Sequence, residues 1–196
     1  MIECLQSQAE PTKFGETTFT GTLVSSDPAA LRRFAEGNRQ GTICKPIFHG
    51  LFVDGNSAFS IFTRRVTPDS LGDDAGVACP VFLQEEIARS ADVRATFIGP
   101  SCFAADIKGD DGIVDWRDPA MKVSYTPSTL PSEVEGLCRV MLSRLGLRYG
   151  AFDFVRAQDG RLVFLEVNPT GEWAWLEDRL GFPMRSAFIQ LFYGGQ

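Results

Sequence analysis

The stretch AFDFVRAQDGRLVFLEVN, residues 151–168, consists of two apolar segments on either side of the dipeptide Asp159-Gly160. Asp-Gly is a preferred loop of a two-residue β-hairpin, because its two positions tolerate positive φ. With this dipeptide as the loop, Gln158 pairs with Arg161, and the register of the whole hairpin is fixed. The stretch therefore predicts an antiparallel strand pair.

The predicted register brings three oxygen-bearing side chains to one face. It sets Asp153 opposite Glu166 and Ala151 opposite Asn168, and side chains alternate between the faces of a sheet. The other face is apolar and predicts a core: Phe152, Phe154, Val163, Leu165 and Val167. Facing carboxylates repel each other, and a divalent cation between them would replace repulsion by coordination. A set of carboxylate and amide oxygens suits Mg²⁺. The alternative that the sequence leaves open is an acidic, solvent-facing strand pair.

The rest of the chain mixes helices and strands without regular βαβ alternation, which predicts an α+β fold in two lobes. One helix is expected over 28–37, begun by Asp27-Pro28. A second helix is expected after the proline-bearing connector 126–133, with Ser132 and Glu135 as a capping box. A last helix is expected over 184–193, and strands are expected over 42–47, 58–66, 81–87, 92–98 and 102–107. The expected division is an N-terminal remnant or linker (1–20), a first lobe (21–86) and a second lobe (87–196).

Composition excludes several classes of protein. The 196 residues are 44% hydrophobic with a net charge of −6, and no Lys/Arg cluster offers the basic face that extended nucleic-acid binding needs. No apolar run is long enough to cross a bilayer, and the first residues do not resemble a secretory signal. Five scattered cysteines without a CxxC pair predict a reducing, cytoplasmic setting. The single histidine, His49, argues against chemistry that needs several histidines.

With these residues in hand, a family resemblance can be stated. FDF followed by FLEVNPTGEWAWLE resembles the C-terminal end of ATP-grasp enzymes. The similarity is greatest to the microviridin-type, or graspetide, ligases that cross-link ribosomally made peptides. PVFLQEEIARSADVRATFIG is similar to the hinge and the D-x-R motif of that family, and CKPI resembles the strand whose lysine contacts nucleotide phosphates. The resemblance covers roughly residues 20–194 and is strongest over 81–99 and 150–177.

The resemblance implies an ATP-grasp fold, in which two α+β lobes hold the nucleotide between them, and it implies ATP and Mg²⁺ as cofactors. The implied magnesium ligands are Asp153, Glu166 and Asn168. The implied nucleotide contacts are Lys45 on the α/β-phosphates and the hinge residues Gln84, Glu85, Glu86 and Ile87. Asp92 is expected to accept from the ribose or hold the peptide substrate. Arg94 is expected to clamp a carboxylate or phosphate, and Arg117 is expected on the γ-phosphate or the acyl-phosphate. Trp173 and Trp175 are expected to pack in a core.

The implied activity is ADP-forming ligation. A carboxylate is activated as an acyl-phosphate and joined to a hydroxyl or amine, so that a precursor peptide is cross-linked through ω-ester or ω-amide bonds. A ligase for free amino acids, a ligase that adds glutamate to a protein, and a nucleotide-binding remnant without catalysis stay open. The precursor peptide is the expected partner, a homodimer is left open, and no membrane or nucleic acid is expected. The chain departs from the family pattern in three respects: a pre-ATP-grasp domain is missing, Lys13 is the one candidate for an upstream phosphate lysine, and no glycine-rich lid is evident over 46–59.

Overall fold

The computed structural model describes residues 18–47, 51–55, 57–71, 79–110, 112 and 114–194. The described chain forms two compact units. The first unit contains Thr20–Ala88 and the described residues between 112 and 121, and the second contains the remaining described residues. The lobes expected at 21–86 and 87–196 stay a prediction, because in this division the segment between 112 and 121 clusters with the first unit. The expected remnant at 1–20, with Lys13, lies almost entirely outside the described residues.

The first unit is built on a four-stranded antiparallel sheet in the order β2-β7-β3-β6 and a separate β4–β5 hairpin. Asp27 begins the first helix as predicted, since its side chain accepts a hydrogen bond from the Ala29 N–H at 3.0 Å. That helix packs Leu31 on Leu23 and Leu83, which form the α1 core. The elements are β2 (Thr22–Ser25), α1 (Pro28–Gly37), β3 (Thr42–Lys45), β4 (Leu51–Asp54), β5 (Ser57–Ser60), β6 (Arg64–Val66), the 3₁₀ helix η1 (Pro68–Leu71) and β7 (Val81–Glu85).

The second unit is built on a six-stranded sheet in the order β1-β12-β11-β8-β9-β10. Its neighbouring strands are antiparallel except β1 and β12, which are parallel. The elements are β1 (Thr18–Phe19), β8 (Arg89–Ile98), β9 (Ser101–Gly109), β10 (Val123–Ser128), α2 (Ser132–Arg144), β11 (Tyr149–Ala157), β12 (Leu162–Asn168), α3 (Ala174–Leu180) and α4 (Met184–Tyr193). The predicted α+β class is confirmed.

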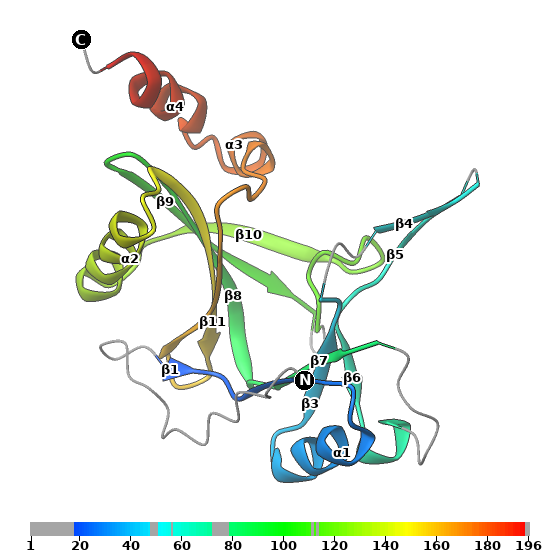
Figure 1. Cartoon of the computed structure of the whole chain (residues 1–196). Helices are drawn as coiled ribbons and strands as arrows, with labels where there is room; N and C mark the ends of the chain where they lie inside the picture. The colour runs from blue at the N-terminus through cyan, green and yellow to red at the C-terminus, as the bar shows by residue number, and fades with distance from the viewer. Residues whose placement is uncertain are drawn as a thin grey trace. The chain divides into compact units, whose positions relative to one another are not determined.

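Helices cover the two faces of this sheet in different ways (Figure 1). On one face α2 buries Val134, Cys138 and Leu142 against Phe97 and Phe152, which together form the α2 core. The opposite face is covered at one end by α3 and α4, whose buried residues pack on Ile98 and Ala105 in the α3–α4 core. Trp173 and Trp175 pack against this second core, as predicted. The rest of that face carries the polar residues described below.

The hairpin of β11 and β12 has the predicted pairs Asp153–Glu166 and Ala151–Asn168, but the length of the loop was predicted wrongly and a bulge was not predicted. The loop has three residues, since the Ala157 N–H donates to the Arg161 carbonyl at 2.9 Å and Gly160 has φ +88°. A β-bulge at the step from Asp153 to Phe154 then leaves Leu165 without a facing residue. The bulge restores the predicted register beyond it.

The same bulge changes which residues of β12 face the α2 core. Phe152, Phe154 and Val167 lie in that core as predicted. Val163 and Leu165 do not, and Leu162 and Phe164 take their places. The shift of one residue between the loop and the bulge moves every side chain of that half of β12 to the other face.

Three further predictions were wrong in detail. The strand expected over 58–66 is interrupted at 61–63, where the Thr63 N–H donates to the Asp115 carboxylate at 2.9 Å in place of a strand neighbour. Ser132 is the first residue of α2 and not its cap, a place that Pro131 takes. Part of the connector expected over 126–133 is strand β10, an edge strand on which Pro127 is tolerated.

Two general findings complete the fold. No helix in the described part of the chain is long and apolar enough to cross a membrane. Four of the five cysteines are described, and all four are free thiols: Cys44, Cys79, Cys102 and Cys138.

Candidate active site

The central feature of the second unit is a row of three charged residues across adjacent strands. Arg94 on β8 faces Asp153 on β11, and Asp153 faces Glu166 on β12. Directly facing residues of neighbouring strands put their side chains on the same face. We call these three residues the Arg94 row. The next row along the strands is Thr96, Ala151 and Asn168, so the three predicted magnesium ligands share one face.

The Arg94 row lies on the same face of the sheet as the α3–α4 core, next to that core and outside it. The Asp153 side chain is 21% exposed and that of Arg94 is 11% exposed, while Glu166 is exposed. Asp92, two residues before Arg94 on β8, shares this face and forms an ion pair with Arg89 at 3.3 Å. Thus Asp92, Arg94, Asp153, Glu166 and Asn168 all occupy one region of one sheet face.

The guanidinium of Arg94 is incompletely satisfied. Its Nε lies 3.2 Å from Asp153 Oδ1, close enough for an ion pair. However, Nε and Nη1 are both buried and make no hydrogen bond to any group of the described chain. Buried donors without acceptors are costly. Since the Nε–H already faces Asp153, the Nη1 end of the guanidinium is the part that suits an additional anionic oxygen ligand such as a carboxylate or phosphate.

The donors on this face fit a hard cation. The facing Asp153 and Glu166 carboxylates repel, and Arg94 offsets that repulsion from the Asp153 side only. No group of three or more His, Cys, Asp or Glu side chains suited to a metal occurs among the described residues. A cation here would therefore take two carboxylates and the Asn168 amide oxygen from the protein, and the remaining oxygens from phosphate and water.

Asn168 also organises the loop that follows β12. Its Oδ1 accepts hydrogen bonds from the Thr170 N–H at 2.9 Å and from the Thr170 hydroxyl at 3.1 Å. This is an Asx-type turn, in which a short polar side chain stands in for a backbone acceptor. The turn occupies both lone pairs of Oδ1, so a cation held by Asn168 would replace one of these two hydrogen bonds.

In the first unit, Lys45 and Gln84 lie on the same face of the four-stranded sheet. Gln84 faces Ile43, and Lys45 follows Ile43 by two residues on β3. Lys45 is half-buried, whereas Gln84 is 4% exposed and donates to Thr22 Oγ1 at 3.2 Å. Its Oε1 is buried and accepts no hydrogen bond within the described chain.

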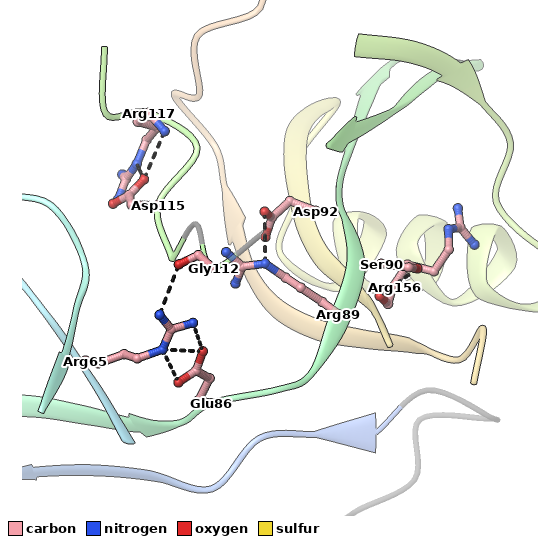
Figure 2. A network of polar contacts seen from close by, with 9 residues as sticks. All are labelled: Arg65, Glu86, Arg89, Ser90, Asp92, Gly112, Asp115, Arg117 and Arg156. Atoms are coloured by element: carbon pink, nitrogen blue, oxygen red, sulfur yellow. Dashed lines mark hydrogen bonds and ion pairs between the residues drawn. The ribbon is translucent and has the colours of Figure 1, made fainter. Parts of the chain in front are cut away.

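The other predicted hinge residues are placed differently. Glu85 alternates with Gln84, so its side chain lies on the α1 face and away from Lys45. Glu86 follows the end of β7 and forms a bidentate ion pair with Arg65, with contacts of 2.6 to 2.9 Å, and Arg65 also donates to the Gly112 carbonyl (Figure 2). Ile87 lies beyond the strand and is half-buried. Their roles at a nucleotide stay a prediction.

Arg117 is held by Asp115 in the segment between β9 and β10. Its Nε and Nη2 donate to the two carboxylate oxygens at 2.8 and 2.7 Å (Figure 2). Asp115 is buried and also accepts from the Thr63 N–H. Burial raises the pKa of Asp115, but the hydrogen bonds from Arg117 and Thr63 outweigh it and hold the pKa at about 2. Part of the positive charge that we expected on a phosphate is therefore offset by Asp115.

Three residues around the Arg94 row were not identified from the sequence: Thr96, Tyr149 and Gly171. Strand alternation could have found Thr96 from Arg94 and Tyr149 from Asp153, because each pair is separated by an even number of residues. Nothing in the sequence indicates the position of Gly171, which depends on the path of a loop.

Three solved structures illustrate what the chain is similar to. The macrocyclase MdnC of Microcystis aeruginosa MRC, bound with precursor peptide MdnA, matches with a TM-score of 0.78 and 31% identity over 91% of this chain and 57% of that chain. The Chryseobacterium gregarium RiPP-associated ATP-grasp ligase, in complex with ADP and a leader and core peptide, matches with a TM-score of 0.80 and 22% identity over 93% of this chain and 56% of its own.

The third is the ATP-grasp ligase PsnB, complexed with a phosphomimetic variant of minimal precursor, Mg and ADP. It matches with a TM-score of 0.66 and 25% identity over 89% of this chain and 54% of that chain. No family model matches the sequence, and no curated protein matches it. The chain thus spans a little over half the length of these ligases.

These findings confirm two predictions from the sequence. The described chain has the ATP-grasp fold, and its similar structures are ATP-grasp ligases associated with ribosomally made peptides. Such relatives have been seen with ADP, Mg and precursor peptides.

Proposed function

We propose that this chain is the ATP-grasp part of an ADP-forming ligase that cross-links a ribosomally made precursor peptide. Its substrate is a side-chain carboxylate of that peptide, and its product is an ω-ester or ω-amide with a hydroxyl or amine of the same peptide. When Mg·ATP is bound, it supplies phosphoryl transfer to the carboxylate, and the hydroxyl or amine then displaces phosphate.

The Arg94 row carries this proposal. The facing carboxylates of Asp153 and Glu166, which would hold the cation, lie directly beside a buried guanidinium whose Nη1 makes no hydrogen bond within the described chain. A ligase of this type needs a metal cation and a guanidinium side by side, because the substrate carboxylate and the transferred phosphoryl group are both anions and must come into contact. We assign Arg94 to the substrate carboxylate, Asp153, Glu166 and Asn168 to magnesium, and Asp92 to the substrate peptide or the ribose.

The remaining roles follow from charge and position. The Lys45 ammonium would contact the α/β-phosphates, and the backbone of Gln84–Ile87 would read the adenine edge, with Glu85 or Glu86 as acceptor of its amino group. Arg117 would neutralise charge on the γ-phosphate in spite of its ion pair with Asp115. The peptide substrate is supported by MdnC and PsnB, each of which has been solved with a precursor peptide.

The direct test is mass spectrometry of a precursor peptide incubated with the chain, ATP and Mg²⁺. The candidate substrate is a short peptide rich in Thr, Asp and Glu, and a gene for such a peptide beside the gene of this protein would favour the proposal. Each bond formed should remove the mass of one water. Loss of water from a free amino acid and an amine, with no change in the peptide, would favour an amino-acid ligase. Mg·ATP binding without any turnover would favour a nucleotide-binding remnant.

Nucleotide contacts can be tested separately by calorimetry with Mg·ADP. Replacing Lys45 by Ala should weaken binding by about tenfold, because one close cation on phosphate is worth about 1.4 kcal/mol or more. Lys122→Ala removes the same charge at an exposed position just before β10 and should leave binding unchanged. Equal affinities of the two variants would remove Lys45 from the site.

A further inference from the structure

The loop after β12 folds back onto the Arg94 row. Beyond the Asn168 turn, the Gly171 N–H lies within hydrogen-bond distance of the Asn168 carbonyl, at 3.4 Å. A Cβ at Gly171 would lie 2.7 Å from the Ala151 Cβ, 3.4 Å from Arg94 Nη1 and 3.5 Å from the Asn168 Cβ. Real Cβ atoms essentially never approach as closely as the first of these distances. The backbone of Gly171 therefore rests on Ala151 at a distance that only glycine permits.

A second contact holds the loop in this position. The Tyr149 hydroxyl donates a hydrogen bond to the Gly171 carbonyl. Tyr149 lies on the same face of β11 as Ala151 and Asp153, and its ring packs on Phe188 of α4 with centroids 5.2 Å apart. Burial raises the pKa of the Tyr149 phenol, against the opposing charge of Arg94, so the hydroxyl stays protonated and can donate.

These contacts meet at the guanidinium of Arg94. It lies between the Asp153 carboxylate, 3.2 Å from its Nε, and the Gly171 backbone, near its Nη1. We propose that Tyr149, Ala151 and Gly171 form a positioning clasp, which fixes the Arg94 guanidinium on the sheet so that its hydrogen-bond donors present one fixed geometry to a substrate carboxylate. None of the three contacts the reacting atoms, and all of them act through Arg94.

This inference rests on the proposed function for its catalytic meaning, and the clasp itself is a property of the protein without ligand. Small displacements of a positioning group lower the rate strongly, since a misplacement of about 1 Å can cost about 100-fold. A change in the clasp should therefore lower the rate of peptide modification much more than it lowers Mg·ADP affinity, because the carboxylates of Asp153 and Glu166 are untouched and only Asn168 adjoins the loop.

The first experiment follows the Arg94 Nε–Hε signal by ¹⁵N NMR in the protein without ligand, assigned by its absence in Arg94→Lys. Gly171→Ala should shift the signal, because the new methyl group must push the loop or Arg94 away. The double variant Ala151→Gly/Gly171→Ala removes the opposing Cβ and should return the signal toward its original position. Gly136→Ala, on α2 with open space around it, is the matched control and should change nothing.

Tyr149→Phe tests the clasp without a steric clash. It removes one hydroxyl and keeps the ring on Phe188, so the melting temperature should change little while the Arg94 signal shifts or broadens. Tyr193→Phe, at a side chain 77% exposed, controls for the loss of a hydroxyl. An Arg94 signal that is unchanged in both Gly171→Ala and Tyr149→Phe would overturn the clasp, and so would failure of Ala151→Gly to reverse the effect of Gly171→Ala.

The second experiment measures kcat and KM for the precursor peptide together with Mg·ADP affinity. Gly171→Ala should lower kcat/KM by about tenfold or more, with recovery in the double variant and a much smaller change in Mg·ADP affinity. If the unaltered protein modifies no peptide although the NMR signal responds as described, the proposed function fails and the clasp stands. If it modifies peptide equally well in all variants, the clasp is overturned and the proposed function stands.

Discussion

Asp153 has a cationic neighbour on one side and an anionic neighbour on the other. Arg94 faces it from β8 and Glu166 faces it from β12, so the carboxylate is attracted to one and repelled by the other. Without a cation, the pair with Arg94 dominates, at 3.2 Å. A bound Mg²⁺ would offset the Glu166 repulsion and leave part of the Arg94 charge free for substrate. With the proposed roles of Asp153 and Arg94, metal binding and substrate binding would be coupled through a single carboxylate.

This coupling predicts the behaviour of Glu166→Gln. The change keeps shape and polarity and removes one charge from a hard-cation site, so magnesium-dependent nucleotide affinity should fall by about tenfold or more, or about 1.4 kcal/mol. The measurement is the rise in melting temperature on addition of Mg·ADP. Without ligand, the variant should be as stable as the original protein or slightly more stable, because the repulsion opposite Asp153 is gone.

Two comparisons make that result interpretable. Glu133→Gln removes the same charge from an exposed position on α2 and should keep the full ligand-induced rise. Val167→Asn changes the opposite face of β12, in the α2 core, and should lower the melting temperature with or without ligand. A full ligand-induced rise in Glu166→Gln would place the cation elsewhere.

Residue-level prediction succeeded where alternation alone decides the outcome. The shared face of Asp92 and Arg94 follows from counting residues along β8, whereas the facing of Asp153 and Glu166 was predicted correctly only because the bulge offsets the longer loop. Gly171 could not be found in this way, because its role comes from a close approach between a loop and a strand. Such an approach depends on the course of the backbone in space, which residue spacing does not specify.

At the scale of elements, the β11–β12 hairpin contains two irregularities that compensate. The loop has one residue more than predicted, and the bulge at Leu165 restores the register. The sequence favoured a two-residue loop because Asp-Gly is its usual signature. A three-residue loop with glycine at the left-handed position uses the same dipeptide, so local sequence does not separate the two. The predicted metal ligands lie beyond the bulge, where the two irregularities cancel, and their register was therefore predicted correctly.

The α2 helix was predicted from its apolar spacing, and its packing can be tested by a matched pair of substitutions. Leu142 lies in the α2 core, where Leu142→Asp would bury an unpaired charge and lower the free energy of unfolding by at least ~3 kcal/mol. Val140→Asp introduces the same charge at a position 47% exposed and should cost far less. Urea unfolding of both variants measures the difference. Equal destabilisation would contradict the packing of α2.

The interrupted strand at 61–63 depends on Asp115, and this dependence predicts an effect of pH. The pKa of Asp115 is lowered from 3.8 to about 2 by Arg117 and the Thr63 N–H, against the effect of burial. A lowered pKa in the folded state contributes stability that is fully present above about pH 4 and is lost as the pH falls through about 2. The contribution is of the order of 2 kcal/mol.

The expected outcome is a fall in the stability of the first unit between pH 5 and pH 2 that is larger in the original protein than in Asp115→Asn. Asp118→Asn, three residues further along the same segment, should keep the original pH dependence. Hydrogen exchange of β6, which follows Thr63 directly, is the local measurement. Identical acid profiles for Asp115→Asn and the original protein would show that this carboxylate does not tie the segment to Thr63.

At the scale of the whole molecule, each unit has its own hydrophobic core. The first unit relies on the α1 core, in which Leu23, Leu31 and Leu83 are buried. The second has a core on each face of its sheet, and both are larger among the described residues. The sequence predicted the α+β class and two lobes from the mixture of elements. It did not predict that the segment between 112 and 121 would cluster with the first unit, because that grouping depends on the Asp115–Thr63 and Arg65–Gly112 contacts between distant residues.

Separate cores predict separate responses to core substitutions. Leu31 is completely buried, so Leu31→Ala should cost about 2–5 kcal/mol in the first unit through lost burial and the cavity that remains. Hydrogen exchange should become faster in β2, β3 and β7, while protection in β8, β11 and β12 stays as it was. Leu176→Ala removes an equally buried leucine from the α3–α4 core and should have the reverse pattern. If either substitution accelerates exchange equally in both sheets, the two units unfold as one, and the division into separate cores does not describe the stability of the protein.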